Sequence, residues 1–391
     1  MKIFQIHNEY IYRGGEDLVV EQEKNLLLKY NYKVHQLIKK NKEEIISLTQ
    51  KLNVTKNLSY SKKSYQIIEK EINRIKPDIV HIHNTFPLWT SSVIDACNNQ
   101  KIPTVMTIHN FRLICAKGVF YRNGDICEKC LWSTPFNAVK YGCFQDSKIK
   151  SIPVAYMIHK SKKGLKIIDK LNKIIVLTDF SKKKLIQAKF PENKIIIKPN
   201  FLSEKINIKI REKKDDFIYA SRLSEEKGFL DLLSVHKKFN FNLKICGDGP
   251  LIELLNNQRN INYLGFLSNE DVNSELAKTK FLIFPSKWYE GFPTIILKAF
   301  QFETVVLAPA LGSISAIIKD GYNGILFKPN NIEDLINKIK WVLSNEEKCN
   351  QIKHNAKKEF NEKYTEKVNY NILKKIYEDA IEENKNNKLL N

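Results

Sequence analysis

Three charged residues in the second half of the chain have the spacing of a site that binds a sugar and a phosphate. Arg222 follows an apolar segment, and Lys227 stands five positions later, at the mouth of a helical pattern. Glu290 lies in the loop WYEGFP, before a helix opened by Pro293. Two cations at such a junction can hold a diphosphate without a metal, and a carboxylate accepts hydrogen bonds from sugar hydroxyls. Because ligands bind at the carboxyl ends of strands in open α/β sheets, we expect these side chains to share one site.

Small residues and a helix start offer backbone contacts to the same ligand. The turn formed by Gly247, Asp248, Gly249 and Pro250 would let a nucleotide base or a phosphate lie against the main chain. The helix opened by Pro293 presents free amide groups and the positive end of its dipole to an anion. This half of the chain therefore predicts a site for a phosphorylated sugar.

A glycine pair and two histidines mark the corresponding edge of the first half. Gly14 and Gly15 stand between a strand pattern and a helical run, where they either let the backbone approach a ligand or form a simple turn. Two further strand patterns end in His83 and His109, each followed by Asn. Parallel strands end at one rim of a sheet, so we expect at least one imidazole to contact a ligand.

Four of the seven cysteines lie close together in the sequence. A C-x2-C pair with two outlying cysteines is compatible with a tetrahedral structural zinc. The outer spacings are irregular, and thiols are often buried as ordinary core residues, so both interpretations remain open. The candidate ligands are Cys115, Cys127, Cys130 and Cys143.

The chain divides into two successive α/β units, because 391 residues exceed one ordinary core. Strand and helix patterns alternate over residues 1–200, with a cysteine-rich insert at 111–145. The alternation starts afresh in residues 201–364, after a charged linker that runs to about 214, and helical residues 365–391 end the chain. A cleft between two such domains is a favoured place for a ligand.

The formal net charge of +21 raises the question of an anionic partner. Only seven of the 64 basic residues are Arg, which nucleic-acid readout favours, so we expect no nucleic-acid partner. The Lys-rich helical pattern at 148–172 is explained either by a solvated helix or by a surface that rests on anionic lipid. No apolar run is long enough for a membrane span, and the N-terminus does not read as a signal peptide. We expect a cytoplasmic protein that contacts the inner face of the membrane.

Several motifs, taken in order, resemble those of family-4 retaining glycosyltransferases with the GT-B fold. The second half carries SRLSEEKG, GDGP, WYEGFP and DGYNGILFKP. The first half carries the glycine pair, IVHIHN, TIHNFRLIC and VLTDFSKKKL. The resemblance covers about residues 1–330, and the combination is more specific than any single motif. It implies an α/β protein with two Rossmann-like domains that face a central cleft.

The resemblance also implies an activity: transfer of a sugar from a nucleotide-sugar to a glycan or a lipid-linked acceptor, with retained configuration and without a catalytic metal. Surface-polysaccharide synthesis is the expected setting. Arg222 and Lys227 would hold the diphosphate, Glu290 would hold hydroxyls of the donor sugar, and His109 would lie near the reacting sugar. Gly14 and Gly15 would approach the phosphates or the acceptor.

The same resemblance assigns backbone contacts and a role for the end of the chain. Residues 365–391 would cross back to the first domain as a helix. The backbone groups that would face sugar and phosphate belong to Gly291, Phe292, Pro293 and Thr294.

One position departs from the family pattern. The family places a second Glu eight residues after the first, where it accepts hydrogen bonds from ribose, but this chain has Lys298 there. An ammonium group only donates. Either other groups hold the ribose, or Lys298 contacts the diphosphate, or donor affinity is lost. An active transferase is the leading prediction. The alternatives are a catalytically silent GT-B protein that binds a glycan or a partner enzyme, and a nucleotide-sugar epimerase or phosphorylase on the same plan.

Overall fold

The computed structural model describes residues 1–11, 14–163, 167–203, 208, 213–255 and 260–389. The chain forms two compact units. Unit 1 comprises Met1–Phe120, Glu128–Asn200 and Asn369–Asn391, and unit 2 comprises Tyr121–Cys127 and Phe201–Val368. Most of the predicted linker up to 214 lies outside the described residues.

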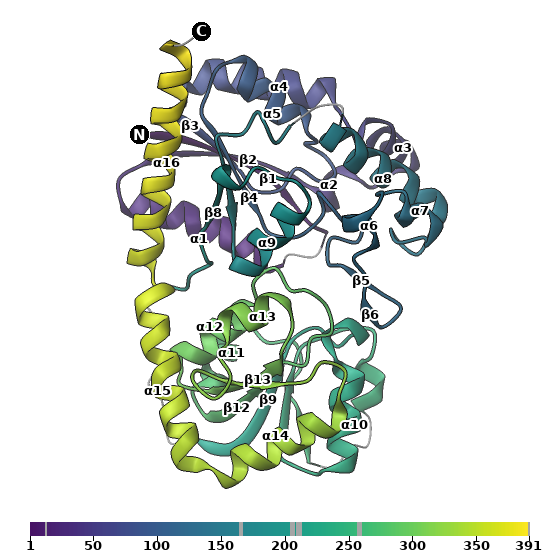
Figure 1. The fold of residues 1–391 in the computed structure, drawn as a ribbon, viewed down its shortest axis with the longest axis vertical. Helices are drawn as coiled ribbons and strands as arrows, with labels where there is room; N and C mark the ends of the chain where they lie inside the picture. The colour runs from purple at the N-terminus through teal and green to yellow at the C-terminus, as the bar shows by residue number, and fades with distance from the viewer. Residues whose placement is uncertain (12–13, 164–166, 204–207, 209–212, 256–259, 390–391) are drawn as a thin grey trace. The chain divides into compact units, whose positions relative to one another are not determined.

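Six parallel strands form the sheet of unit 1, in the order β2-β1-β3-β4-β7-β8 (Figure 1). The apolar residues of the inner strands are buried, as expected for a parallel sheet covered by helices, whereas Ile38 and Ile197 of the two edge strands are exposed. The strands are β1 (Lys2–Glu9), β2 (Lys33–Lys40), β3 (Ile79–Ile82), β4 (Thr104–Ile108), β7 (Lys173–Val176) and β8 (Ile195–Ile197).

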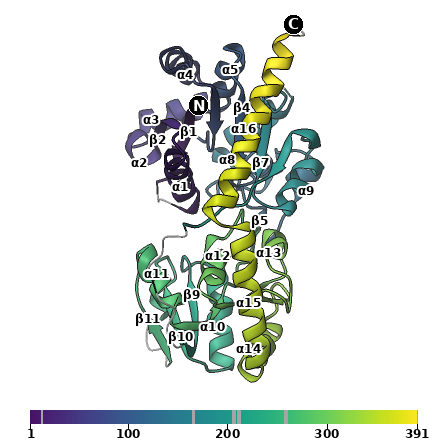
Figure 2. The same cartoon turned by 90° about the vertical axis from the view of Figure 1, so that its left-hand side faces the viewer.

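Helices connect the strands of unit 1, and the last helix of the chain, α16, packs on the sheet. Figure 2 shows α16 running along unit 1. Leu373, Ile376 and Tyr377 of α16 share one core with Ile3 and Ile79. The helices are α1 (Gly15–Lys29), α2 (Asn41–Glu44), α3 (Leu48–Asn57), α4 (Lys62–Ile75), α5 (Ser92–Asn99), α6 (Lys129–Trp132), α7 (Asn137–Lys140), α8 (Lys148–Lys163), α9 (Asp179–Gln187), the 3₁₀ helix η1 (Glu192–Lys194) and α16 (Glu366–Leu389).

The insert and the Lys-rich helix differ from the sequence-based prediction. All of 111–145 was predicted to belong to the first domain. Instead, Tyr121–Cys127, which carry the hairpin β5 (Tyr121–Arg122) and β6 (Asp125–Ile126), belong to unit 2. The physical reason is packing, since the ring of Tyr121 lies edge-on to Trp288 at 6.5 Å. The helix predicted over 148–172 ends at Lys163, and residues 164–166 lie outside the described residues.

Unit 2 repeats the parallel plan with the strand order β11-β10-β9-β12-β13-β14. Phe217, Ile245 and Ile283 are among the buried core residues of three central strands. The strands are β9 (Lys214–Ala220), β10 (Leu243–Cys246), β11 (Ile261–Tyr263), β12 (Thr279–Ile283), β13 (Val305–Pro309) and β14 (Ile325–Phe327).

Helices cover the sheet of unit 2 (Figure 1). They are η2 (Glu225–Lys227), α10 (Phe229–Lys238), η3 (Ile252–Leu255), α11 (Asn269–Leu276), α12 (Thr294–Gln301), α13 (Gly312–Ile317), α14 (Ile332–Ser344) and α15 (Glu346–Lys363). Two parallel α/β domains were predicted from the alternating strand and helix patterns, and the structure confirms this fold class. Among the described residues, no helix is both long enough and apolar enough to cross a bilayer.

Candidate active site

Lys227 and Glu290 form an ion pair in unit 2. Lys227 ends η2, which follows β9, and Glu290 lies in the loop between β12 and α12. Lys227 Nζ lies 2.7 Å from Glu290 Oε1, and Ser286 Oγ donates to the same oxygen at 2.6 Å. The ring centre of Trp288 lies 4.8 Å from Lys227 Nζ. The structure thus brings together a cation and a carboxylate that the sequence places 63 residues apart.

Close backbone packing holds these two loops together. Gly228 follows Lys227 with a φ of 72°, in the region that favours glycine. A Cβ on Gly228 would lie 1.9 Å from the carbonyl oxygen of Pro285, at the end of β12. The amide of Lys287 also donates to the carbonyl of Glu226 at 2.9 Å. The distance between Lys227 and Glu290 is therefore fixed by backbone contacts as well as by the ion pair.

The GDGP turn packs against the loop that carries Arg222. Leu223 donates its amide to the carbonyl of Asp248 at 2.9 Å. A Cβ on Gly247, whose φ is 145°, would lie 2.0 Å from the carbonyl oxygen of Ser221, and one on Gly249 would lie 2.4 Å from that of Leu223. These glycines are required by the close approach of a neighbouring loop of the protein.

Gly247→Ala should therefore lower the free energy of unfolding by about 3 kcal/mol, because the new methyl group collides with a backbone carbonyl and the φ is strained. Gly15→Ala is the matched control, since its Cβ meets no atom within 4 Å. We expect the control to change this free energy by about 0.5 kcal/mol or less. Urea denaturation of both variants measures the difference, and equal effects would contradict the packing argument.

The structure places the other predicted donor-side residues as follows. The side chain of Arg222 is exposed and forms no hydrogen bond or ion pair among the described residues, whereas its carbonyl accepts from Tyr219 at 2.7 Å. Pro293 is the N-cap of α12, so Thr294 begins the helix and its first amides are free of helical partners. The ring of Phe292 packs on Tyr364 at 6.0 Å, which anchors this loop.

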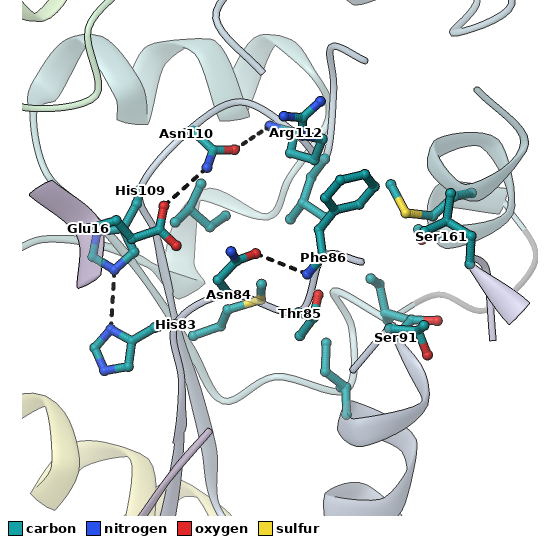
Figure 3. Close-up of a pocket in the computed structure, with 18 residues that line it drawn as sticks. Glu16, His83, Asn84, Thr85, Phe86, Ser91, His109, Asn110, Arg112 and Ser161 are labelled. Atoms are coloured by element: carbon teal, nitrogen blue, oxygen red, sulfur yellow. Dashed lines mark hydrogen bonds between the residues drawn. The ribbon is translucent and has the colours of Figure 1, made fainter. Parts of the chain in front are cut away.

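A cavity in unit 1 lies at the carboxyl ends of β3 and β4 (Figure 3). His83 Nδ1 and His109 Nε2 lie 3.2 Å apart, and both residues line the cavity. Burial lowers the pKa of His83 to about 3 and holds the pKa of His109 well below its usual value. Both imidazoles are therefore neutral at pH 7. Apolar and polar groups face the same space, including Asn84, Phe86, Ser91, Ile94, Met106, Met157 and Ser161.

Glu16 faces this cavity and was not assigned a role from the sequence. Asn110 donates to Glu16 Oε2 at 3.3 Å, while Glu16 Oε1 is buried without a partner among the described residues (Figure 3). Burial, with the nearby charge of Asp17, raises the pKa of Glu16 to about 8. The signal available in the sequence was its place directly after Gly14 and Gly15, at the start of α1. Such a group can give or take a proton near neutral pH.

The predicted glycine pair starts α1, with Gly14 as the N-cap. Asp17 fixes this start, because its carboxylate accepts from the amide of Gly14 at 2.8 Å and lies 2.7 Å from His7 Nε2 of β1. A Cβ on Gly14 or Gly15 would meet no atom within 4 Å. Protein packing therefore does not explain the pair, and the predicted approach to a ligand remains a prediction.

A charged network lies beneath the cavity. Glu23 of α1 is fully buried, with Oε2 at 3.1 Å from Lys198 Nζ and Oε1 at 3.0 Å from His81 Nδ1 and 3.3 Å from His83 Nε2. Although burial alone would raise the pKa of Glu23, the charges of His81 and Lys198 hold it well below its usual value. Glu23, His81 and His83 are near enough to hold a metal ion, but Lys198 already supplies a cation to the carboxylate. We interpret the set as a charge network that supports the cavity wall.

The four candidate cysteines are divided between the two units of the chain. Cys115, Cys130 and Cys143 belong to unit 1, and Cys127 belongs to unit 2. Over the described residues, the only group with three potential ligands in reach of one another is the Glu23 set, and it contains no cysteine. Cys130 and Cys143 instead pack against a small apolar core with Val154 and Ile158 of α8. Zinc binding by these cysteines therefore stays a prediction, beside the alternative of ordinary core thiols.

Two family models match the chain: Glycosyltransferase Family 4 over residues 40–204, and Glycosyl transferases group 1 over residues 201–359. The chain belongs to the family-4 glycosyltransferases. An uncharacterized glycosyltransferase of Methanocaldococcus jannaschii is 26% identical over 392 residues, which is 97% of this chain and 98% of that protein. The O-antigen chain mannosyltransferase C of Escherichia coli is 25% identical over 157 residues, which is 38% of this chain and 42% of that protein.

Solved structures confirm the GT-B fold of this glycosyltransferase. A glycosyltransferase from Rickettsia africae matches with a TM-score of 0.69 at 18% identity, over 97% of this chain and 98% of that one. Anabaena HepE, in complex with UDP and glucose, matches with a TM-score of 0.63 at 15% identity, over 96% of this chain and 99% of that one. At these identities the likeness establishes the fold alone.

The position that departs from the family pattern is buried in this glycosyltransferase. Lys298 lies within α12, is 7% exposed, and donates to Asn269 Oδ1 at the start of α11 at 2.7 Å. The carboxylate that the family uses for ribose is thus replaced by a lysine whose ammonium is bound to an amide oxygen. Nearby, Glu303 has a φ of 55°, in the left-handed region that favours glycine.

Stability should depend on pH through Lys298. Burial lowers its pKa from 10.5 to about 8. Between about pH 8 and pH 10.5 the unfolded chain binds more protons than the folded chain, so the free energy of unfolding should rise as the pH is raised.

Lys298→Met should remove the part of this pH dependence that comes from Lys298. It should also raise the free energy of unfolding by about 2 kcal/mol at neutral pH, because no charge is then buried. Urea denaturation at about pH 7 and about pH 10 measures both effects. Lys358→Met, which removes an exposed lysine, is the control, and a wild-type pH slope in Lys298→Met would contradict the argument.

Proposed function

We propose that this glycosyltransferase moves a sugar from a nucleoside diphosphate sugar to a glycan or lipid-linked acceptor, with retained configuration, during synthesis of a surface polysaccharide. The observation that carries the proposal is the cluster of Lys227, Glu290 and Ser286 at the strand ends of unit 2. Relatives named for O-antigen and teichuronic acid synthesis support the polysaccharide setting, and HepE was solved with UDP and with UDP-glucose.

On the donor side, the chemistry requires positive charge at the leaving diphosphate. When the glycosyl–oxygen bond breaks, the sugar becomes cationic in character and the diphosphate gains negative charge. Lys227 has further donor positions beyond its bond to Glu290, and the exposed guanidinium of Arg222 is free to pair with phosphate. The amides at the start of α12 add a third source of positive potential.

Glu290 would hold the sugar in this arrangement. Its carboxylate already accepts from Lys227 and Ser286, so it is fixed before a donor arrives. Its remaining acceptor positions can receive hydrogen bonds from hydroxyls of the hexose. Because the same carboxylate contacts Lys227, sugar and leaving group would be positioned by one connected set of side chains.

On the acceptor side, we assign the unit 1 cavity to the end of the acceptor that carries the attacking hydroxyl. Its polar wall, with Glu16, Asn84 and Asn110, offers hydrogen bonds to hydroxyls, and its apolar residues suit the faces of a sugar or the start of a lipid. Glu16 can receive the hydroxyl proton or return one, since its pKa lies at about 8. His109, which is neutral, lies in the same wall and remains the predicted contact to the reacting sugar.

The cations of the donor site perform the task that a divalent metal performs in other transferases. We therefore expect transfer to continue in the presence of a chelator. The setting that this proposal requires is the cytoplasm, where nucleotide-sugars are made, with the protein placed at the inner face of the membrane.

The test is a thermal-shift screen of the purified chain against uridine, guanosine and adenosine diphosphate sugars, followed by product analysis with the donor that binds. Binding to the folded form raises the melting temperature. We expect one donor to stabilise the protein and to lose its sugar in a product with retained configuration. Lack of stabilisation by every donor would reject the proposal. Conversion of the donor to another nucleotide-sugar without an acceptor would indicate an epimerase instead.

The buried Lys298 favours one competing function, a silent GT-B protein that binds a glycan or a partner enzyme. Lys298→Glu separates the two. If the wild type does not bind nucleotides and Lys298→Glu binds them much more tightly, the result would support the hypothesis of a catalytically silent protein. Loss of an existing activity would support the transferase, because Asn269 and Lys298 would then belong to a working site.

A further inference from the structure

Helix α3 has no buried side chain, although it carries large apolar residues. Ser47 caps it by accepting from the amide of Gln50 at 3.2 Å, and Gln50 Oε1 accepts from the amide of Ser47 at 2.8 Å. Leu48 and Leu52 are one helical turn apart and so lie on one face. A helix of this length is marginal in water by itself, and most helical stability comes from packing of an apolar face. The apolar face of α3 therefore lacks the contact that such a face normally has.

Helix α8 has buried side chains but also carries an exposed apolar face. Ile149, Ile152 and Tyr156 fall on one face by their spacing, and that face is exposed, while Val154 and Ile158 point into the core. The two helices share that core, because Leu58, at the end of α3, packs with these residues of α8. The side chains of the proposed surface are 49% to 79% exposed: Ile46, Leu48, Leu52, Ile149, Ile152 and Tyr156.

The charge around these residues identifies the kind of partner. Residues 45–68 contain four lysines and no acidic residue, and residues 147–168 contain six lysines and no acidic residue. Lys51, Lys56, Lys148 and Lys150 are exposed, and none of them forms an ion pair among the described residues. Exposed apolar side chains flanked by unpaired lysines match a surface of anionic headgroups above acyl chains.

We propose that the apolar faces of α3 and α8 form a docking surface for an anionic lipid bilayer. The inference deepens the acceptor side of the proposed function, since a lipid-linked acceptor is held in such a bilayer. The apolar residues enter the headgroup region, and the lysines pair with lipid phosphates. The earlier prediction from the sequence concerned only residues 148–172. The structure adds α3 to this surface. The sequence alone did not show that the apolar face of α3 packs against no other element of the described chain.

Vesicle flotation of the full chain tests the proposal, without donor or acceptor. Vesicles of phosphatidylcholine are compared with vesicles that contain about one third phosphatidylglycerol. We expect binding to the anionic vesicles, weakened by salt. The paired changes Leu48→Ser with Leu52→Ser, and Ile149→Ser with Ile152→Ser, should each lower binding at least about tenfold. Phe266→Ser with Leu343→Ser removes two exposed apolar residues of unit 2 and should leave binding unchanged.

Three results would overturn the proposal. The first is absence of binding to anionic vesicles at low salt, and the second is equal binding by the wild type and both paired variants. The third is a wild-type dimer that the paired variants dissociate while their vesicle binding stays unchanged. The last result would assign the surface to a second copy of the chain. Melting temperatures of all variants confirm that they are folded. The donor screen is performed without lipid, and the flotation is performed without donor. A negative donor screen would therefore not change the flotation result, and absence of vesicle binding would not change the result of the donor screen.

Discussion

Lys227→Ala is expected to lower kcat about a thousandfold, at nearly unchanged melting temperature. Lys227 Nζ contacts Glu290 and lies at the ends of strands where the leaving diphosphate would sit. Loss of one preorganised donor to a developing anion costs about 3–4 kcal/mol of transition-state stabilisation. The fold should tolerate the change because Glu290 keeps its bond from Ser286 and is near the surface. Steady-state kinetics with the donor found by the screen measure the effect.

Lys287→Ala is the matched control for this prediction. It removes a lysine of the same loop region that pairs with Asp231 at 3.2 Å, away from Glu290. We expect its kcat to stay within about threefold of the wild type, since a partly exposed ion pair contributes little. A Lys227→Ala enzyme that keeps more than a tenth of the wild-type kcat, or a control that loses as much, would remove the proposed leaving-group role.

Lys198→Met should lower the free energy of unfolding by about 3–5 kcal/mol at pH 7, the second large effect that we expect. Lys198 and Glu23 are each 1% exposed in their side chains, and their charged atoms lie 3.1 Å apart. Removing one partner of a fully buried pair leaves the other charge uncompensated. Urea denaturation measures the loss, and Lys182→Met, which breaks an exposed pair with Glu192, should cost about 0.5 kcal/mol or less.

The pH dependence gives this prediction a second readout. In the wild type the pKa of Glu23 is held low, so its contribution to stability is present above its unfolded pKa and is lost as the pH falls. Without Lys198, ionisation of the Glu23 carboxylate stabilises the fold less. The difference in free energy of unfolding between the wild type and Lys198→Met should therefore become smaller at acidic pH. The double variant Glu23→Gln with Lys198→Met should recover part of the loss at pH 7. A deficit that is independent of pH and not recovered would show that lost packing, not charge, is responsible.

The fold, and the meeting of Lys227 with Glu290, were predicted well because they follow from local patterns. Apolar strand segments alternate with helical ones, and parallel strands in such a sheet end at one rim. That rule alone placed Lys227 after β9 and Glu290 after β12 on the same edge, where they meet. It likewise placed His83 and His109 together at the ends of β3 and β4.

The unit to which the insert belongs could not be predicted from the sequence, for a physical reason. Cysteine spacing constrains a metal site only if the intervening chain returns each thiol to one point, and irregular spacings do not show this. Tyr121 packs on Trp288, so the hairpin β5–β6 and Cys127 belong to unit 2, whereas Cys115 belongs to unit 1. Side-chain packing between residues more than a hundred positions apart therefore decided where the insert belongs.

The sequence by itself determined the two α/β domains, the family, and the rim at which charged and polar residues gather, because these depend on periodicity and on short spacings. Only the tertiary structure decided the partners of buried charges. Glu23 meets Lys198, Lys298 meets Asn269, and Glu16 faces a cavity in which its pKa is raised. The energy of a charge depends on its burial and on neighbours from distant segments, and neither is written in the local pattern of residues.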